Sequence, residues 1–320
     1  MIEYQAIILA QRTINPYIKQ TALYQSQYLS KLCNGGVFLK LENQQITNSF
    51  KIRGAYNKLL NLTPEEKQKG VITASSGNHA QAVAVVATQL NIPAKIIVPI
   101  NTPINKLEKI RQFPITLELF GNNYDESENY ALMQAKKLDL TYVSAYNDKF
   151  IIAGQGTIGL EILFNLPSIT DILVPLGGGG LLAGIAIAAK NISPKIKIYG
   201  IQTEACPAFY ESLKAGKIVD VKMKDSIADG MYGGIEKGSI TFDIIKELVD
   251  EVFVVKEKAI RKSIALLWSE DNIVAEGAAA SAITPILENK KSFKNRTVVS
   301  VITGGNIDST LFDKVIQEFR

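Results

Sequence analysis

Residues 171–189 read DILVPLGGGGLLAGIAIAA and decide the fold class. The run from Ile172 to Ala189 contains 18 residues without a charge, which is long enough for a membrane span. Pro175 and the four consecutive glycines, however, would break a single lipid-facing helix. A buried strand, a glycine turn and a buried helix account for the same residues. We therefore predict a strand-turn-helix unit and no membrane span.

The four glycines, Gly177 to Gly180, predict an anion site at the start of that helix. Without Cβ atoms in the way, several backbone N–H groups can converge on one phosphate. No Lys-Ser or Lys-Thr follows the glycines, so the loop that binds nucleoside triphosphates is absent. A dinucleotide site is an open alternative. Gly178, Gly180 and Ala183 match the Rossmann fingerprint, and Glu204 follows at the distance of a ribose-binding acid.

The alternation of strand and helix signals extends outward from this unit in both directions. Short runs rich in valine and isoleucine alternate with longer amphipathic stretches. The short runs predict strands at residues 37–41, 71–74, 95–99, 172–176, 196–201, 251–255 and 298–302. Most of them are continuously apolar, as in an open parallel sheet with helices on both faces. Thr63, Pro64 and Glu66 form the start signal of a further helix.

Composition and charge narrow the class of function. The 320 residues are 47% hydrophobic and 21% charged, and no long linker divides them. The net charge of +4 indicates neither nucleic acid nor a membrane surface as a partner. Two cysteines are too few for a disulfide framework, and no export signal opens the chain, so we expect a cytoplasmic protein. The single histidine, His79, excludes multi-histidine metal sites and makes hydrolase triads a poor fit.

Two further strand-to-helix turns carry polar residues, and ligands bind at such turns in open parallel sheets. Ser75-Ser76-Gly77-Asn78-His79 follows the strand at 71–74, and its hydroxyls and N–H groups at a helix start suit an anion. A serine cap with a glycine turn is the simpler explanation of this segment alone. Thr303-Gly304-Gly305-Asn306 follows the strand at 298–302 and precedes a helix near Ser309. The Thr303 hydroxyl could hydrogen-bond a ring nitrogen, or the segment could be a capped tight turn.

Lys51 is the most promising reactive side chain. Asn48 or Ser49 can cap a helix that runs to about Leu62, which places Lys51 in its first turn. Cations are disfavoured at that end of a helix, and Phe50 is an apolar neighbour, so we expect a lowered pKa and a good nucleophile or base. A solvated surface lysine with its stem on Phe50 is the alternative.

Taken together, these segments resemble the threonine and serine dehydratases, which with serine racemase belong to the fold-type-II pyridoxal phosphate enzymes. The resemblance rests on residues 49–55, 75–79, 177–180 and 303–306, and it extends to residues 152–157 and 227–230. It implies an α/β fold with two open, twisted, mostly parallel sheets flanked by helices. A large pyridoxal phosphate-binding domain would comprise residues 1–50 and 149–320, and a small domain residues 51–148.

The resemblance also implies a role for each turn. Lys51 would hold the cofactor as a Schiff base, with Phe50 beside it. Asn78 would hydrogen-bond the cofactor's phenolic oxygen, and Thr303 would meet its pyridine nitrogen. The backbone amides that would hold the phosphate are those of Gly177, Gly178, Gly179, Gly180 and Leu181. The residues that would hold the substrate carboxylate are Ser75, Ser76, Gly77, Asn78 and His79.

The activity implied is that of a threonine and serine ammonia-lyase, a cytoplasmic enzyme of amino-acid metabolism that forms a homodimer or higher homo-oligomer. The amine of Lys51 would remove the α-proton and the β-hydroxyl would leave. Threonine would give 2-oxobutyrate and serine would give pyruvate, each with ammonia. Biosynthetic members of the family continue into a regulatory domain, whereas this chain ends soon after Asn306. We therefore expect a catabolic enzyme without isoleucine feedback.

Serine racemase is the alternative within the family. Ser76 matches the racemase residue that acts as an acid on the opposite face of the cofactor. Of the racemase metal site, Glu204 and the Ala208 carbonyl are in place, but Tyr210 stands where a second acid is expected, so no firm metal site is predicted.

Two alternatives lie outside the family. A nicotinamide-dependent oxidoreductase could use Gly178, Gly180 and Glu204, but it would leave Lys51 and Thr303 without a task. A catalytically silent binding protein could have kept the fold, although such a protein needs no lysine at position 51. The preference between threonine, serine and other 3-hydroxy amino acids stays open.

Overall fold

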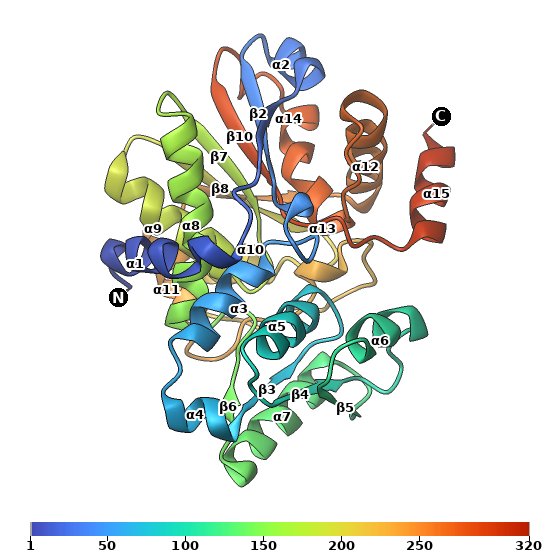
Figure 1. The fold of residues 1–320 in the computed structure, drawn as a ribbon. Helices are drawn as coiled ribbons and strands as arrows, with labels where there is room; N and C mark the ends of the chain where they lie inside the picture. Colours follow the sequence, from blue (N-terminus) through green and yellow to red (C-terminus); the bar gives the residue numbers. More distant parts are fainter. Residues whose placement is uncertain (1, 320) are drawn as a thin grey trace.

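The computed structural model describes residues 2–319 and has an α/β fold built on two sheets (Figure 1). The larger sheet has the strand order β1-β2-β10-β7-β8-β9 and the smaller one β5-β4-β3-β6. All neighbouring strands are parallel except β1, which is antiparallel to β2. The predicted class of two mostly parallel sheets flanked by helices is confirmed.

The strands of the larger sheet are β1 (Leu23–Gln25), β2 (Gly36–Leu41), β7 (Asp171–Pro175), β8 (Lys197–Thr203), β9 (Glu251–Val255) and β10 (Thr297–Ile302). Those of the smaller sheet are β3 (Val71–Ala74), β4 (Ala94–Val98), β5 (Thr116–Leu119) and β6 (Thr141–Tyr142). The α-helices are α1 (Tyr4–Ile14), α2 (Gln27–Cys33), α3 (Lys51–Leu60), α4 (Pro64–Lys69), α5 (Asn78–Gln89), α6 (Ile104–Arg111), α7 (Tyr124–Leu138), α8 (Lys149–Asn165), α9 (Gly180–Ile192), α10 (Ala208–Ala215), α11 (Ile240–Leu248), α12 (Glu257–Asp271), α13 (Gly277–Ala280), α14 (Thr284–Glu288) and α15 (Ser309–Glu318). Short 3-10 helices are η1 (Asn15–Tyr17), η2 (Glu42–Gln44), η3 (Asp229–Met231) and η4 (Ser281–Ile283).

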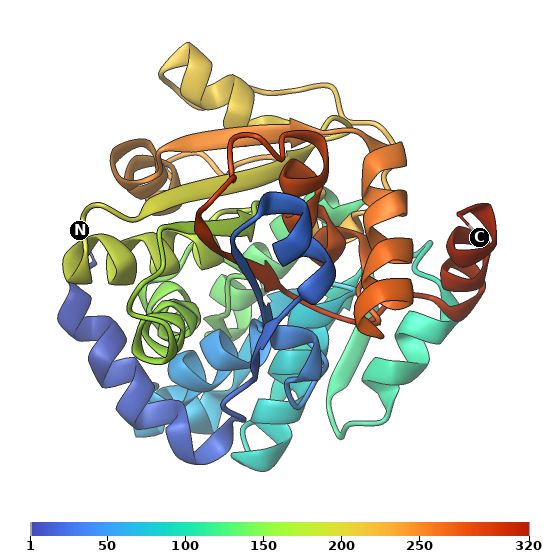
Figure 2. The same cartoon turned by 90° about the horizontal axis from the view of Figure 1, so that it is seen from above.

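Side chains on the two faces of the larger sheet enter two separate cores. Ile172 and Val174 of β7 lie in a cluster with residues of α1, α8 and α9. Leu173 lies in a second cluster with residues of α2, α12 and α14. This is the alternation expected of a strand buried on both faces. Seen from above, α12 and α15 lie on one side of the molecule and α1 on the other (Figure 2).

The smaller sheet is covered in the same way. Ala80 and Ala84 of α5 lie in a cluster with Ile96 of β4 and with α6. The opposite face contributes Ile97, which lies in a cluster with Ala131 of α7. Helices α3 and α5 therefore lie between the two sheets, as Figure 1 shows.

The position of β10 brings the predicted functional turns together. Although β10 comes last in the chain, it lies between β2 and β7. In the register of the sheet, Ile302 of β10 pairs with Leu41 of β2, and Ser300 pairs with Leu173 of β7. The carboxyl ends of the three strands thus lie side by side. The chain that leaves them carries Lys51, Thr303 and the glycine loop.

The sequence predicted most strands correctly. Each of the seven predicted strands is present within two residues of its predicted ends, and Thr63 and Glu66 form a capping box at the start of α4. Strands β1, β5 and β6 were not predicted, since they are two to four residues long and their side chains are half-buried or exposed. The division into domains 1–50 with 149–320 and 51–148 stays a prediction.

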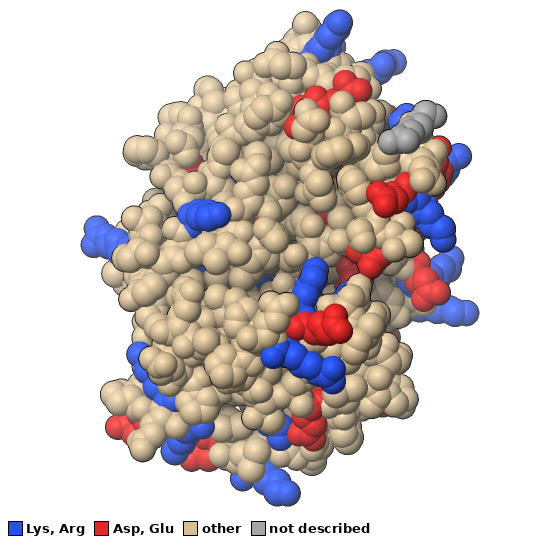
Figure 3. Space-filling view, turned by 45° about the vertical axis from the view of Figure 1, so that its right-hand side comes forward, with Lys and Arg blue, Asp and Glu red and all other residues tan. Residues whose placement is uncertain are grey.

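The 171–189 stretch forms β7, a turn and the buried start of α9, as predicted. Among residues 2–319, no helix combines the length and the apolar character needed to cross a bilayer. On the face shown in Figure 3, basic and acidic side chains are interspersed, as the small net charge leads one to expect.

Candidate active site

A cleft of about 520 Å³ lies where helices α3, α5 and α9 begin. Every residue predicted from the sequence to bind the cofactor or the substrate lines it. Those residues are Phe50, Lys51, Ser75, Ser76, Gly77, Asn78, His79, Gly177, Gly178, Gly179, Gly180, Leu181 and Thr303. The three helices direct their positive N-terminal ends at this cleft, which favours negatively charged ligand groups there.

The glycine loop is shaped for close approach. A Cβ at Gly178 would lie 2.3 Å from the Tyr146 ring, and a Cβ at Gly180 would lie 2.8 Å from Oε1 of Gln155. Gly179 has a φ of +90°, which disfavours any other residue. Within residues 2–319, the N–H groups from Gly177 to Leu181 donate to no backbone oxygen. The loop thus offers free N–H groups at the start of α9, the arrangement that holds a phosphate.

A second anion site lies at the start of α5. Gly77 is its N-cap and makes no side-chain cap bond, so the alternative explanation of this segment as a serine cap is wrong. The Ser75 hydroxyl instead accepts from the Gly77 N–H. The N–H groups of Asn78 and His79 belong to the first turn, where a helix has no partners of its own for them.

The His79 ring is neutral and is not suited to acid-base catalysis. Its Nε2 lies 3.1 Å from the Val143 carbonyl oxygen, which can only accept, so Nε2 carries the proton. Burial and the nearby Lys51 lower the pKa of His79 to about 3. Nδ1 can therefore only accept, and a carboxylate ligand would meet the backbone N–H of His79, not its ring.

Lys51 is the first residue of α3 and lies at the base of the cleft. Its Nζ donates to the Ala145 carbonyl oxygen at 2.9 Å and lies 5.2 Å from the centre of the Phe50 ring. Burial lowers the pKa of its amine to about 8, although Glu276 opposes this shift. The alternative of a solvated surface lysine was wrong.

The start of α3 differs from the prediction in its cap. Phe50, not Asn48 or Ser49, is the N-cap residue, and no side chain caps the helix. Asn48 adopts a left-handed conformation with a φ of +53°, and Ser49 forms a bridge with Gly304. The Phe50 N–H donates to the Thr303 carbonyl oxygen at 3.1 Å. Backbone bonds to the end of β10 therefore fix the position of Lys51.

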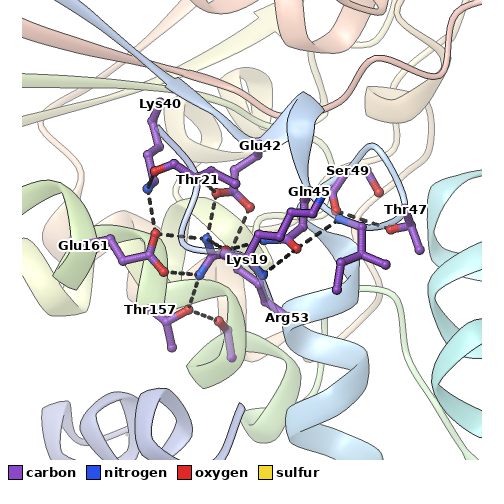
Figure 4. Close-up of polar contacts among 12 residues, drawn as sticks. Lys19, Thr21, Lys40, Glu42, Gln45, Thr47, Ser49, Arg53, Thr157 and Glu161 are labelled. Carbon is purple, nitrogen blue, oxygen red and sulfur yellow. Dashed lines mark hydrogen bonds and ion pairs between the residues drawn. The ribbon is translucent and has the colours of Figure 1, made fainter. Parts of the chain in front are cut away.

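A buried network of charges anchors α3 to the larger sheet (Figure 4). Arg53 contacts Glu42 at 2.8 Å and Glu161 at 2.6 Å, and Lys40 contacts Glu161 at 2.6 Å. The side chains of Lys40, Glu42 and Arg53 are 0% exposed. Burial alone would raise the pKa of Glu42, but Arg53 and Lys40 hold it below its usual value. Sequence reasoning missed this network, since its members come from distant segments.

Thr303 is buried at the end of β10, and Asn306 follows it into the cleft. Nδ2 of Asn306 donates to Oδ1 of Asn78 at 2.7 Å. Nδ2 of Asn78 in turn donates to Glu276 at 2.8 Å. Sequence reasoning missed Glu276. Its signal was available, because Glu276 is the single charged residue in the stretch 272–286.

Gln155 is a second residue that sequence reasoning missed. It is 1% exposed, lies on α8 and lines the cleft. Neither its Oε1 nor its Nε2 has a hydrogen-bond partner within residues 2–319. Leaving a buried amide without partners costs free energy, so its environment suits a polar ligand group or a water molecule.

The residues of the suggested racemase metal site lie outside the cleft. Glu204 is exposed at the end of β8, and Tyr210 is 39% exposed on α10. Among residues 2–319, no three metal-ligating side chains form a group that could hold an ion. A second hollow, of about 780 Å³ between α1, α3, α8 and α11, contains none of the predicted site residues.

Comparisons with known proteins extend over nearly the whole chain. A family model described as "Pyridoxal-phosphate dependent enzyme" matches residues 14–304. The L-threonine ammonia-lyase of Thermotoga maritima is 43% identical over 319 residues, which cover 99% of this chain and 79% of that protein. The catabolic L-threonine dehydratase of Staphylococcus aureus is 42% identical over 312 residues, 96% of this chain and 90% of that protein. The structure of maize serine racemase matches with a TM-score of 0.92 and 32% identity, covering 99% of this chain and 97% of that one.

Proposed function

The chain belongs to the pyridoxal-phosphate dependent enzyme family, and on that premise we propose that it is an L-threonine ammonia-lyase that also accepts L-serine. It is a lyase with pyridoxal phosphate as cofactor, so the resemblance seen in the sequence is confirmed. The nicotinamide-dependent alternative is set aside by the same finding. In the proposed reaction threonine loses its α-proton and its β-hydroxyl, and hydrolysis of the C–N bond then leaves 2-oxobutyrate and ammonia.

The observation that carries the proposal is that Lys51 lines the same cleft as two anion sites. These sites are the free N–H groups of the glycine loop and the start of α5. These fit the phosphate of the cofactor and the carboxylate of an amino acid, respectively. When bound, pyridoxal phosphate supplies an electron-withdrawing ring that makes the α-proton of an attached amino acid acidic.

The side chains then have distinct tasks. Lys51 would hold the cofactor through its amine, and its free amine would take the α-proton of the substrate as a general base. Asn78 would hold the cofactor at its phenolic oxygen, and Thr303 would hold it at its ring nitrogen. Ser75, Ser76 and the N–H groups at the start of α5 orient the substrate carboxylate. A catabolic role, a cytoplasmic location and a homodimer are part of the proposal; the relative from Staphylococcus aureus carries the word catabolic in its name.

The test combines a spectrum with product analysis. The purified protein is expected to show a visible absorption band that borohydride reduction fixes onto Lys51, as located by peptide mapping. Incubation with L-threonine should then give equal amounts of ammonia and 2-oxobutyrate. A band on Lys51 without ammonia from threonine, serine or other 3-hydroxy amino acids would contradict the lyase activity proposed here.

Gln155→Met is expected to weaken cofactor binding without lowering the stability of the ligand-free protein. Gln155 forms no hydrogen bond with another residue in 2–319, so the variant should have a free energy of unfolding equal to that of the wild type or higher. Losing a polar contact with the bound cofactor should weaken its affinity about tenfold. Urea unfolding and a spectroscopic titration with pyridoxal phosphate measure the two effects.

Gln202→Met is the matched control for this prediction. Gln202 is also 1% exposed, but its side chain donates to the Leu176 carbonyl oxygen and accepts from the Tyr210 N–H. Its replacement should therefore lower the stability of the ligand-free protein. If Gln155→Met behaves in the same way as this control, Gln155 has no role in holding the cofactor.

Serine racemisation is a second candidate activity, because Ser76 lines the cleft and the fold matches that of maize serine racemase. An acid on the cofactor face opposite Lys51 is what such a reaction needs, so Ser76→Ala should abolish any D-serine formed from L-serine. Chiral chromatography of the reaction mixture measures this. The wild-type protein is expected to release more ammonia than D-serine, and the reverse ratio would make racemisation the main activity.

A further inference from the structure

Glu276 brings a carboxylate to the lining of the cleft from a part of the chain with no predicted role. It precedes α13, is 7% exposed and lines the cleft. Its backbone N–H donates to the Gly304 carbonyl oxygen at 3.1 Å. A Cβ at Gly304 would lie 2.5 Å from Oε1 of Glu276. The carboxylate therefore lies against the turn that begins with Thr303.

The contacts of Glu276 fix the orientation of the Asn78 amide. Nδ2 of Asn78 donates to the two carboxylate oxygens, at 2.8 and 3.1 Å. On the other side, Oδ1 of Asn78 accepts from Nδ2 of Asn306 at 2.7 Å. If the Asn78 amide were flipped, its oxygen would face the carboxylate oxygens of Glu276, and its NH2 group would face the NH2 group of Asn306. Neither hydrogen bond could then form. Because Nδ2 carries two hydrogens, one stays available for a ligand.

Three charged groups face Glu276 from the elements around it: Lys51 of α3, Lys106 of α6 and Asp229 of η3. Lys106 also contacts Asp229 at 2.7 Å. Burial and Asp229 raise the pKa of Glu276 to about 7, while the donors Asn78 and Asn306 and the charge of Lys106 oppose the rise. Above about pH 7, Glu276 is thus mostly ionised, and its negative charge acts on Lys51.

We propose that Glu276 is a positioning residue of the proposed lyase: its carboxylate holds Asn78 so that one Nδ2–H points to the phenolic oxygen of the cofactor, and its charge favours a protonated nitrogen on Lys51. The inference rests on the proposed function for the identity of the bound group. Glu276 acts through Asn78 and Lys51 and needs no contact with the substrate.

The experiment titrates the visible absorption of the holoenzyme with pH, without substrate. In Glu276→Gln the negative charge is lost, so the midpoint for loss of the proton from the Lys51 nitrogen should fall by about one pH unit or more. The new side chain has one acceptor oxygen in place of two, so Nδ2 of Asn78 loses one of its two contacts and the affinity for pyridoxal phosphate should fall about tenfold. Equilibrium titration of the ligand-free protein with the cofactor measures the second effect.

Glu288→Gln is the matched control, because it removes the same charge from an exposed position outside the cleft. It should leave both the midpoint and the affinity unchanged. Glu276→Gln with the midpoint and affinity of the wild type would overturn the proposal. A variant that loses thermal stability but keeps both values would overturn it too, because Glu276 would then have only a structural role.

Glu276→Asp decides the question if Glu276→Gln fails to fold. It keeps the charge but withdraws it from Asn78 by one methylene, so the midpoint should stay within about half a unit while the affinity falls. Unchanged affinity in this variant would overturn the proposal. A failure of the proposed function can be distinguished from a failure of this proposal, because the titration needs no turnover. If the wild-type protein binds the cofactor but releases no ammonia, the proposed reaction is contradicted. The titration of the variants still tests the role of Glu276.

Discussion

Lys51→Ala is expected to lower the rate of ammonia release from L-threonine by about a thousand-fold or more. The variant loses both the amine that joins the cofactor and the base that takes the α-proton. The absorption band that borohydride fixes to the protein should disappear as well. A coupled assay for 2-oxobutyrate and a visible spectrum check the two effects.

Lys58→Ala removes the same side chain two turns further along α3 and serves as the control. Lys58 contacts Asp148 at 2.6 Å and lies outside the cleft, so this variant should keep its band and its activity. Lys51→Ala with activity close to that of Lys58→Ala would contradict the role of Lys51.

The lowered pKa of Lys51 gives the same site a pH signature. Only the neutral amine attacks an aldehyde, so the rate at which ligand-free protein takes up pyridoxal phosphate should rise about tenfold per pH unit and level off near pH 8. An ordinary lysine would let the rate rise to about pH 10. Stopped-flow absorption at saturating cofactor distinguishes the two profiles.

Arg53→Met is expected to lower the free energy of unfolding of the ligand-free protein by about 3–5 kcal/mol at pH 7. The substitution leaves Glu42 and Glu161 buried with only Lys40 to balance them, and unpaired buried charges are costly. Lys69→Met is the control, because Lys69 pairs with Asp139 at the surface, with side chains 50% and 79% exposed. Its loss should cost less than about 1 kcal/mol. Urea unfolding measures both values.

Lowering the pH should reduce the difference in free energy of unfolding between Arg53→Met and the wild type. Arg53 holds the pKa of Glu42 below its usual value of 4.5, so the ionised carboxylate stabilises the wild type above about that pH. As the pH falls through the lowered pKa, Glu42 is protonated and the wild type loses this contribution. The variant lacks Arg53, so it loses less stability when Glu42 is protonated. Equal differences at pH 7 and pH 4 would show that lost packing, not lost charge, explains the effect.

The sequence was sufficient for those parts of the site that one local segment specifies. Four glycines after an apolar run allow few alternatives to a tight strand-to-helix turn, and a lysine beside Phe50 at a helix start is expected to be partly buried. In the structure the loop has no room for side chains, and burial is the cause that lowers the pKa of Lys51.

What the sequence could not give depends on contacts between distant segments. Asn48 has the residue type of a helix cap, but the bridge between Ser49 and Gly304 places Phe50 there. Glu276 meets Asn78 across 198 residues, and nothing near either residue indicates the pairing. Arg53 likewise looks like a surface arginine until Glu161 is found 108 residues away. Tertiary contacts override local preference in each of these cases.

The place of β10 between β2 and β7 has a consequence for biosynthesis. Protein chains leave the ribosome from their N-terminal end, and domains begin to fold as they emerge. A nascent chain that has emerged only to residue 296 contains β2 and β7 but lacks the strand that joins them, and it lacks Thr303 and the backbone partner of Phe50. The cleft therefore cannot be completed until β10 and Thr303 have been translated. A fragment released before that point would lack both the strand between β2 and β7 and the turn that holds Phe50.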